Sequence, residues 1–327
     1  MKRTVSRVLP RLALLCFSIA LSVGLVEGFS RLVYTQPWYD RLVAEQVDGD
    51  WTASIRRNSY GLRGHDYEPT KPPHSRRVLL LGDSFTFGSG VADNEAIFPA
   101  LLEKQLDAEF SAHGSSVEIL NGGIPGSRTD DWVDMLQKVR GSFQPDLIVI
   151  VFFLRDGTRT SAADDFFIPI RDRIVAQNQQ SWLYQNLFLY RLYQDAKDRS
   201  FISDQYASAI RGSYFGTGAQ TDEWRIAQFN IRKIKAIGEE TNTRTALVVF
   251  PILAALDERY PFKDVCDLIA GYGSENELPV HNLLPAFLGK NAADLWVSPN
   301  NQHPNALGHQ IAAQSLLPFL RRLLEDY

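Results

Sequence analysis

Cysteine is scarce in this chain of 327 residues, which contains only Cys16 and Cys266. The two lie in regions that should be far apart, so we expect no disulfide, and no Cys/His cluster has the spacing of metal ligands. Low-complexity tracts and internal repeats are also absent from the sequence, which excludes repeat architectures. No Gly-x-Ser-x-Gly elbow occurs, and the Gly-rich segment 82–90 lacks the lysine of a phosphate-binding loop. We therefore expect no cofactor.

An excess of basic residues is missing as well, since the formal net charge is −4. Residues 1–30 hold four basic and one acidic residue, and the remainder of the chain holds 30 basic and 37 acidic residues. Such a balance gives no general attraction to nucleic acid or to anionic lipid surfaces. We expect no nucleic-acid partner. The length leaves room for one large domain with extensions.

The amino terminus has the pattern of an exported protein. An uncharged stretch, residues 12–26, follows four basic residues: Lys2, Arg3, Arg7 and Arg11. The stretch is short for a bilayer span, which needs about 20 apolar residues, unless it is extended at either end. We favour an uncleaved signal anchor that leaves the domain outside the cytoplasm. The alternatives are a cleaved signal peptide, giving a secreted or periplasmic protein, and a buried core helix.

A serine follows a short apolar run near residue 80. Residues 77–81 read Arg-Val-Leu-Leu-Leu, which is typical of a buried parallel strand, and Gly-Asp-Ser follows. This order places the hydroxyl of Ser84 at the carboxyl edge of a sheet, where open α/β folds bind ligands. If a helix begins there, its free N–H groups can hold an oxyanion. An ordinary turn is the other interpretation, because Gly and Ser are common turn residues.

A histidine at the far end of the chain complements this serine. The segment 298–309 precedes an apolar-periodic stretch, 311–324, which predicts a final helix with Asn305 as its N-cap. His303 then lies in the loop that enters this helix, where it can face Ser84 across the sheet edge. Together, the serine and histidine segments resemble the first and last sequence blocks of the SGNH/GDSL hydrolase superfamily.

The resemblance extends to two further segments. Residues 121–126, Asn-Gly-Gly-Ile-Pro-Gly, resemble the second block, which implies that the N–H groups of Gly126 and Ser84 form an oxyanion hole. A turn that needs Gly for positive φ is compatible with that role. Residues 58–63, Asn-Ser-Tyr-Gly-Leu-Arg, resemble the lead-in of membrane-anchored members. The resemblance implies a serine nucleophile at Ser84 and a general base at His303.

Two blocks depart from the family pattern. The third block should read Gly-x-Asn-Asp, but here Arg155 takes the place of the oxyanion asparagine and only Asp156 is kept. The last block should carry an Asp two or three residues before the histidine, and both positions are asparagine, Asn301 and Asn300. We therefore assign the carboxylate position to these two residues and the third oxyanion position to Arg155. Asp83 and Asp156 are expected to be structural residues that neighbour the site.

These departures have a chemical consequence. Replacing the carboxylate of such a triad by an amide lowers the rate by about four orders of magnitude. Losing one oxyanion donor lowers it by about two to three orders more. Asp294 is one carboxylate that could compensate, and Arg155 offers five N–H donors to an oxyanion or an anionic substrate. Alternatively, Arg155 forms a salt bridge with Asp83 or Asp156.

The rest of the chain predicts an α/β fold, a flavodoxin-like three-layer α/β/α sandwich with a parallel sheet, behind an N-terminal transmembrane or signal helix. We divide it into a signal anchor or signal peptide (1–34), a linker and lead-in (35–76) and a hydrolase domain (77–327). Strands are expected at 77–81, 117–120, 146–153, 245–250 and 279–284. Helices are expected at 95–110, 129–139, 224–238 and 311–324, the second capped by Ser127 or Thr129.

An insert from 157 to about 221 does not fit the strand–helix alternation. It contains an aromatic-rich stretch, 181–193, which we predict to be one helix. Because the insert leaves the sheet edge beside Asp156, it could form a lid or determine substrate choice. Its aromatic residues could instead pack the insert onto the core, stack on sugar rings or seat an acyl chain.

Three classes of function follow. We favour an extracytoplasmic serine esterase or lipase that deacylates a glycan or lipid of the cell envelope, held to the membrane by its N-terminal helix. The second is an O-acyltransferase that uses the same serine and histidine. The third is a catalytically silent module that binds a glycan or a membrane partner, favoured by Arg155, Asn300 and Asn301.

Overall fold

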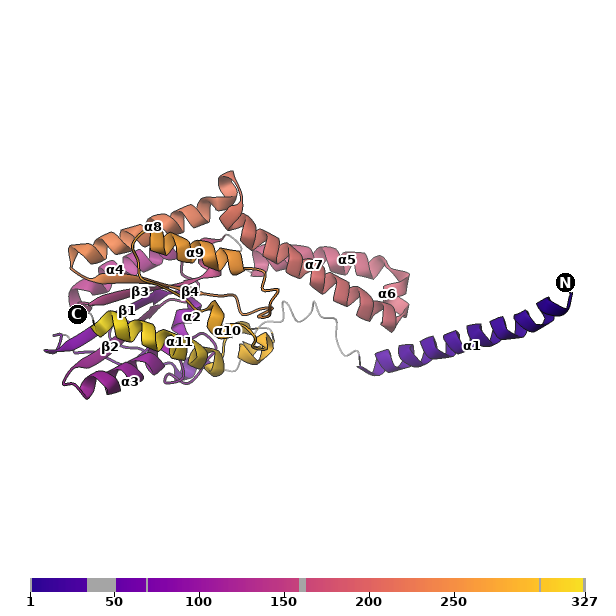
Figure 1. Cartoon of the computed structure of the whole chain (residues 1–327), viewed down its shortest axis with the longest axis horizontal. Helices are drawn as coiled ribbons and strands as arrows, with labels where there is room; N and C mark the ends of the chain where they lie inside the picture. Colours follow the sequence, from indigo (N-terminus) through magenta and orange to yellow (C-terminus); the bar gives the residue numbers. More distant parts are fainter. Residues whose placement is uncertain (1, 34–50, 69, 159–162, 300, 326–327) are drawn as a thin grey trace. The chain divides into compact units, whose positions relative to one another are not determined.

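A computed structural model describes residues 2–33, 51–68, 70–158, 163–299 and 301–325 (Figure 1). The chain forms two compact units. One consists of Met1–Glu45 and Ala162–Tyr206, and the other of Gln46–Ser161 and Ala207–Tyr327. The predicted site residue Asn300 and residues 35–50 of the predicted linker and lead-in lie outside the described residues. The domain boundaries drawn from the sequence stay a prediction.

The second unit is built on a five-stranded parallel sheet with the order β2-β1-β3-β4-β5. The strands are β1 (Ser75–Gly82), β2 (Ser116–Gly123), β3 (Leu147–Phe153), β4 (Arg244–Phe250) and β5 (Val280–Asn282). β3 is buried throughout and β4 nearly so, because helices cover both faces of the sheet. The chain leaves β1 toward β2 on one side and returns to β3 on the other, so the strand order reverses beside β1.

Helices form the two outer layers (Figure 1). α3 (Phe98–Ser111) and α11 (Ala306–Glu325) pack together below the sheet in this view. The opposite face carries α4 (Thr129–Phe143), α8 (Asp222–Glu240) and α9 (Lys263–Glu275). Tyr272 of α9 joins α8 through a hydrogen bond from its hydroxyl to the carbonyl of Gln228 (2.7 Å). The predicted three-layer α/β/α sandwich is confirmed.

Short elements occupy the connections. α2 (Ser84–Phe87) follows β1, and the 3-10 turn η3 (Leu154–Gly157) follows β3. After β5 come α10 (Leu284–Phe287), η5 (Ala292–Leu295) and an antiparallel hairpin of β6 (Trp296–Ser298) and β7 (Asn301–Pro304). Two further 3-10 turns, η2 (Trp51–Ser54) and η4 (Gly218–Thr221), lie in the lead-in and before α8.

Helix caps were predicted with mixed success. Asn305 caps α11 as expected, since its Oδ1 accepts hydrogen bonds from the N–H groups of Leu307 and Gly308, although the helix begins five residues earlier than predicted. The predicted caps of α4 were wrong, because Arg128 is the N-cap residue there. Ser127 Oγ instead accepts a hydrogen bond from Trp132 Nε1 (2.9 Å), and Thr129 Oγ1 accepts one from Asn230 Nδ2 (3.0 Å).

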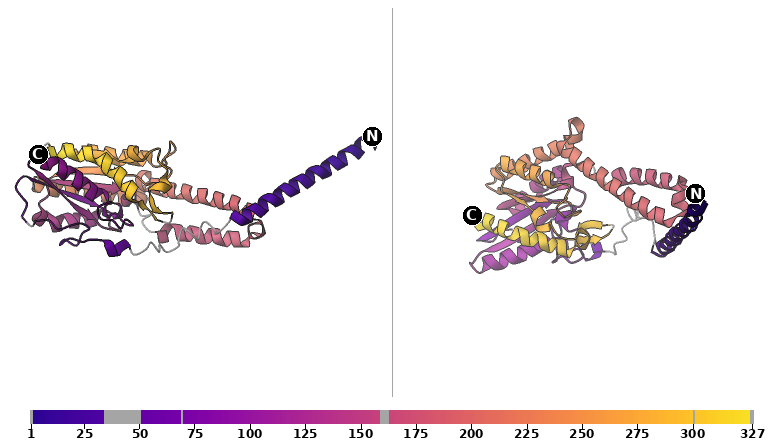
Figure 2. Two further views of the ribbon diagram at one scale, coloured as in Figure 1. Left: turned by 90° about the horizontal axis from the view of Figure 1, so that it is seen from below. Right: turned by 45° about the vertical axis from the view of Figure 1, so that its right-hand side comes forward.

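The first unit is helical. It contains α1 (Lys2–Val33), α5 (Ala163–Gln180), α6 (Trp182–Asn186) and the first part of α7 (Phe188–Phe215), which continues into the second unit. In α1, the 23 residues Pro10–Leu32 have a mean hydropathy of 2.1 and are long and apolar enough to cross a membrane. α5 and α7 run side by side (Figures 1 and 2).

The single helix predicted at 181–193 was wrong, because the chain breaks between α6 and α7. Leu187 adopts an extended conformation (φ −116°, ψ 109°), which ends α6. Ser181 starts that short helix by accepting a hydrogen bond from the N–H of Tyr184 (3.3 Å). An apolar sequence with helical periodicity does not reveal such a break, since no Gly or Pro marks it.

Candidate active site

Ser84 is the first residue of α2, directly after the central strand β1. Asp83 caps this helix, because its Oδ1 accepts a hydrogen bond from the N–H of Phe85 (2.9 Å). At Gly82, a Cβ atom would lie 3.0 Å from the carbonyl oxygen of Val151 and closer still to Thr86. Only glycine therefore lets β1 turn into α2 this tightly. The turn presents the half-buried Ser84 at the carboxyl edge of the sheet.

His303 meets Ser84 from the β6–β7 hairpin. Its Nε2 lies 2.8 Å from Ser84 Oγ, although the two residues are 219 positions apart in the sequence. The ring also lies beside Phe85, with 5.2 Å between the ring centroids. The structure thus brings together the serine and the histidine that the sequence singled out.

Asn301 determines which nitrogen of His303 carries the proton. Its Oδ1 lies 3.2 Å from the backbone N–H of His303, which can only donate, so the oxygen of the amide must face the histidine. The same oxygen lies 2.6 Å from His303 Nδ1, which must therefore carry a hydrogen. In the neutral ring, Nε2 then holds the free lone pair that faces the Ser84 hydroxyl. Asp294, the alternative carboxylate, is exposed, and its backbone carbonyl accepts a hydrogen bond from Asn305 Nδ2 (2.8 Å).

Three expected oxyanion donors lie at the ends of three adjacent strands. The N–H of Ser84 is the first of α2 and has no acceptor within the helix. Gly126 lies in the turn after β2, is exposed and has a φ of 75°, as its predicted turn role requires. The N–H of Ile124 in that turn donates to the carbonyl of Gly82 (3.0 Å), which ties it to the end of β1. Arg155 lies half-buried in η3, after β3.

Two carboxyl groups, Asp83 after β1 and Asp156 after β3, are close enough for their charges to affect each other. Asp156 Oδ2 accepts a hydrogen bond from the N–H of Phe153 (2.7 Å), so Asp156 fixes the turn after β3. Burial raises the pKa of Asp83 to about 6, against the opposing effect of hydrogen bonding from Phe85 and the charge of Arg155. Burial and the nearby charge of Asp83 raise the pKa of Asp156 well above its usual value. The charges of Asp83 and Asp156 therefore affect each other, and the positive charge of Arg155 acts on both.

Sequence reasoning missed Arg63, which supports this site from the lead-in. The side chain is 1% exposed, and its guanidinium donates to the carbonyl oxygens of Gly88 and Val91 (2.7 Å each) and to Asn94 Oδ1 (3.0 Å). Burial lowers the pKa of Arg63 to about 10. The only signal in the sequence was the family-like segment 58–63, which does not say what the arginine contacts.

The segment that Arg63 holds reaches from the serine to Asn301. The N–H of Gly88 donates to the carbonyl of Ser84 (3.0 Å), which closes α2. Gly90 has a φ of 87°, and a Cβ atom there would lie 2.6 Å from Val297 and 3.2 Å from Asn301 Nδ2. Arg63 thus fixes a turn that packs against both α2 and Asn301.

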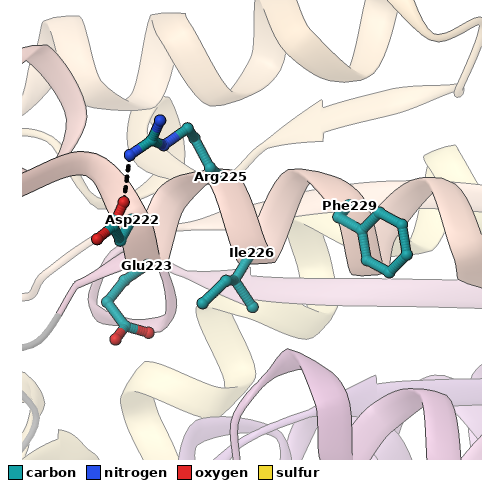
Figure 3. Close-up of a pocket in the computed structure, with 5 residues that line it drawn as sticks. All are labelled: Asp222, Glu223, Arg225, Ile226 and Phe229. Atoms are coloured by element: carbon teal, nitrogen blue, oxygen red, sulfur yellow. Dashed lines mark hydrogen bonds and ion pairs between the residues drawn. The ribbon is translucent and has the colours of Figure 1, made fainter. Parts of the chain in front are cut away.

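A separate pocket of about 410 Å³ lies on α8 (Figure 3). It is lined by Asp222, Glu223, Arg225, Ile226 and Phe229, and Arg225 is paired with Asp222 across one turn of the helix. None of these residues belongs to the serine–histidine site. Within the described parts of the chain, no three His, Cys, Asp or Glu side chains are grouped as metal ligands would be.

Parts of this chain are similar to known proteins. The arylesterase of Vibrio mimicus is 32% identical to the chain over 85 residues, which is 26% of this chain and 40% of the arylesterase. The chain thus matches less than half the length of that relative.

Similar solved structures include the psychrotrophic esterase EstA from Pseudoalteromonas sp. and the lipase/acylhydrolase from Enterococcus faecalis. EstA is 15% identical, with 76% of this chain and 99% of that chain covered and a TM-score of 0.45. The Enterococcus protein is 17% identical, with 75% and 95% covered and a TM-score of 0.40. A model of the GDSL-like lipase/acylhydrolase family matches residues 80–311. Because that match spans more than half of the chain, this protein belongs to the GDSL-like lipase/acylhydrolase family.

Proposed function

We propose that this protein is a serine ester hydrolase in which Ser84 is the nucleophile and His303 the general base. The observation that carries the proposal is the 2.8 Å distance between Ser84 Oγ and His303 Nε2 at the carboxyl edge of the sheet. A serine hydroxyl becomes a useful nucleophile when a neighbouring imidazole takes its proton. Membership of the GDSL-like family supports an ester as the substrate.

The reaction proceeds in two halves. Ser84 Oγ attacks the ester carbonyl while its proton moves to His303 Nε2, and the resulting imidazolium then protonates the departing alcohol oxygen. The acyl group is left on Ser84. In the second half, His303 takes a proton from water, the hydroxide attacks the acyl carbonyl, and the proton returns to Ser84 as the carboxylic acid leaves. The N–H groups of Ser84 and Gly126 stabilise the oxyanion in both halves, with the guanidinium of Arg155 as the third donor.

Asn301 takes the place of the triad carboxylate in this mechanism. Its amide oxygen holds the ring orientation and the Nδ1–H tautomer, as a carboxylate would. It carries no charge to stabilise the imidazolium, so we expect a slower enzyme than one with an aspartate. Asn300 remains the second candidate for this position.

We place the hydrolase outside the cytoplasm, anchored by α1. The support is the apolar segment Pro10–Leu32 and the basic residues before it. Basic residues flanking a span stay on the cytoplasmic side, which leaves the second unit outside. An acyl ester on a glycan or lipid of the envelope is then the substrate class within reach.

The test uses the full chain in detergent with p-nitrophenyl acetate and p-nitrophenyl butyrate. We expect turnover that is lost in Ser84→Ala and His303→Ala, together with covalent labelling of Ser84 by a fluorophosphonate. Release of free acid, without transfer to an added sugar, distinguishes hydrolysis from acyl transfer. Equal background rates in wild type and both variants, with no labelling, would contradict the proposal and favour a silent binding module.

A further inference from the structure

At the corner between α6 and α7, residues 182–193, polar side chains are buried inside the hairpin and large apolar side chains are exposed. Inside the hairpin, Tyr184 is buried and its hydroxyl donates to the buried Asp195 (2.8 Å). Buried Asn178 of α5 likewise donates to buried Asp198 of α7 (3.2 Å). The outside of the corner instead carries exposed large apolar side chains: Trp182, Leu183, Leu187, Leu189, Leu192 and Tyr193. A hairpin surrounded by water would bury such residues first.

Charge is missing from the same region. Between residues 174 and 194 the only charged side chain is Arg191, whereas residues 195–199 contain four charges. Arg191 is half-buried and holds the corner together, because its guanidinium donates to the carbonyls of Tyr184 and Gln185 and lies over the ring of Phe188. The outer surface of the corner is therefore mainly apolar and aromatic. Its exposed polar groups include the uncharged amides of Gln185 and Asn186, and its one charge is the half-buried Arg191.

The corner is fastened to the end of the apolar helix α1. The carboxylate of Glu27 accepts hydrogen bonds from the N–H groups of Phe188 and Leu189 (2.9 Å each), the first of α7. Arg31 donates to the carbonyl of Asn186 (3.2 Å) and lies 4.6 Å from the centre of the Phe188 ring. These contacts satisfy both charged side chains near the end of Pro10–Leu32.

The contacts fix the depth of the corner relative to the span. Glu27 is five residues before Leu32, which corresponds to about 8 Å along a helix. The span is about 34 Å long at the same rise, and the hydrocarbon core of a bilayer is about 30 Å thick. A centred span extends about 2 Å beyond the hydrocarbon at each end, so the first turn of α7 lies about 6 Å inside it. This is about one helical turn below the headgroup level. Trp and Tyr are enriched at that level, and Trp182 and Tyr193 are 69% and 64% exposed.

We propose that the α6–α7 corner is a membrane-docking surface, which inserts Trp182 and its apolar neighbours into the headgroup region of the bilayer that α1 spans. The occupant of this surface is lipid. The proposal rests on the anchor role proposed for α1. The proposal gives this end of the insert a function other than that of a lid. The contacts with α1 set the position of the corner relative to the membrane.

The experiment measures the depth of single labelled positions in the full chain. The protein carries Cys16→Ser, and Cys266 is buried, so an introduced cysteine is the accessible thiol. An environment-sensitive nitrobenzoxadiazole label is placed at Trp182→Cys or Tyr193→Cys. Phe201→Cys is the matched control, an exposed aromatic position on α7 about 20 Å beyond its start. The protein is reconstituted into vesicles of phosphatidylcholine and phosphatidylglycerol, with or without phosphatidylcholine brominated on its acyl chains.

We expect the labels at positions 182 and 193 to shift their emission to the blue and to lose most of it in brominated vesicles, while the label at position 201 responds to aqueous iodide only. If the protein floats with the vesicles but iodide quenches the labels at all three positions, the docking surface is overturned and the anchor is not. Protein that fails to float would overturn the anchor and the docking surface together. Shielding seen only in native membranes would point to a protein partner and overturn a lipid one.

Discussion

In the proposed mechanism His303 is the general base, and the amide of Asn301 orients its ring. The amide oxygen fixes the tautomer as well as a carboxylate would, since it accepts from both the backbone N–H and Nδ1 of His303. It differs in charge, and charge is what stabilises the imidazolium as Ser84 loses its proton. Asn301 thus provides the hydrogen bonds of a triad carboxylate but not its negative charge.

Asn301→Asp should therefore increase activity. The substitution keeps the size of the side chain and adds a negative charge next to His303 Nδ1. We expect kcat for p-nitrophenyl acetate to rise by at least about tenfold, with about four orders of magnitude as the ceiling. Gln302→Glu is the control, because it adds the same charge at an exposed neighbouring position. An equal rise in the control, or no rise in Asn301→Asp, would contradict the role given to Asn301.

The pKa of Asp83 predicts how stability depends on pH. Burial raises the pKa of this carboxyl from its ordinary 3.8 to about 6 in the folded protein. The folded state then binds more protons than the unfolded state between these values, so stability falls as the pH rises through that range. Asp83→Asn should remove this part of the fall, and asparagine can keep the cap on α2.

Urea midpoints of tryptophan fluorescence, measured across this pH range in detergent, test the prediction. The wild-type midpoint should decrease more steeply than that of Asp83→Asn. Asp93→Asn is the control, since it removes a carboxylate from the exposed part of the turn after α2. Parallel curves for wild type and Asp83→Asn would show that the carboxyl is ionised in both states.

At the scale of elements, the lead-in before β1 is part of the active-site framework. Its Arg63 is buried and donates to carbonyl oxygens in the turn that follows the nucleophile helix. Arg63→Ala would leave these buried acceptors unpaired and should destabilise the second unit by about 3 kcal/mol or more. Looser packing of Gly90 against Asn301 should lower kcat as well, with less effect on KM.

Arg57→Ala is the matched control for this substitution. Arg57 lies in the same lead-in and also approaches the ring of Phe87 (5.6 Å), but it is exposed. Urea midpoints and kcat are measured for both variants. We also expect free guanidinium at low concentration to restore part of the activity of Arg63→Ala, which a general loss of folding would not allow. Equal effects of the two substitutions would contradict a positioning role for Arg63.

The elements that could be predicted from the sequence are those whose pattern is local. β3 is a continuous apolar run because helices cover both faces of the sheet, and Asn305 precedes an amphipathic stretch in the way that N-caps do. Ser84 and His303 were found because their segments resemble family blocks. The proximity of the two side chains depends on the strand order β2-β1-β3-β4-β5, which no local pattern contains.

What escaped prediction depends on distant partners. In the sequence, Arg63 has the pattern of an exposed arginine, but in the structure the turn after α2 buries it. Glu27 is a charged residue in an apolar helix, and its partners are two N–H groups of α7. The break at Leu187 belongs to the same class, because the new helix begins where Glu27 can cap it. Buried or paired polar groups of this kind are specified by tertiary contacts and not by periodicity.

At the scale of the whole molecule, the proposed anchor and the serine–histidine pair belong to different units. The described contacts of α1 are with the α6–α7 corner in the first unit, and the serine–histidine pair lies entirely in the second. α7 continues from one unit into the other, so a single helix connects the proposed membrane surface to the hydrolase. Substitutions in the corner should therefore change membrane depth without changing kcat on soluble esters.

The orientation of α1 decides whether the hydrolase reaches the cell envelope, and the charges flanking the span predict it. Four basic residues lie in residues 2–11, whereas residues 31–50 contain only Arg31 and Arg41. We expect this bias to keep the amino terminus in the cytoplasm and to leave the second unit outside. The full chain fused at its carboxyl end to alkaline phosphatase, which is active only outside the cytoplasm, should give phosphatase activity in cells.

Replacing Lys2, Arg3, Arg7 and Arg11 by glutamine should reduce that phosphatase activity, because the bias then favours the opposite orientation. Replacing Lys104, Lys138, Arg173 and Arg199 by glutamine removes as many charges at positions far from the span in the sequence and should leave the activity unchanged. Full activity after the amino-terminal substitutions would mean that the flanking charges do not orient α1. Activity absent from the unaltered fusion, with the protein intact in the membrane, would place the hydrolase in the cytoplasm and exclude an envelope ester as its substrate.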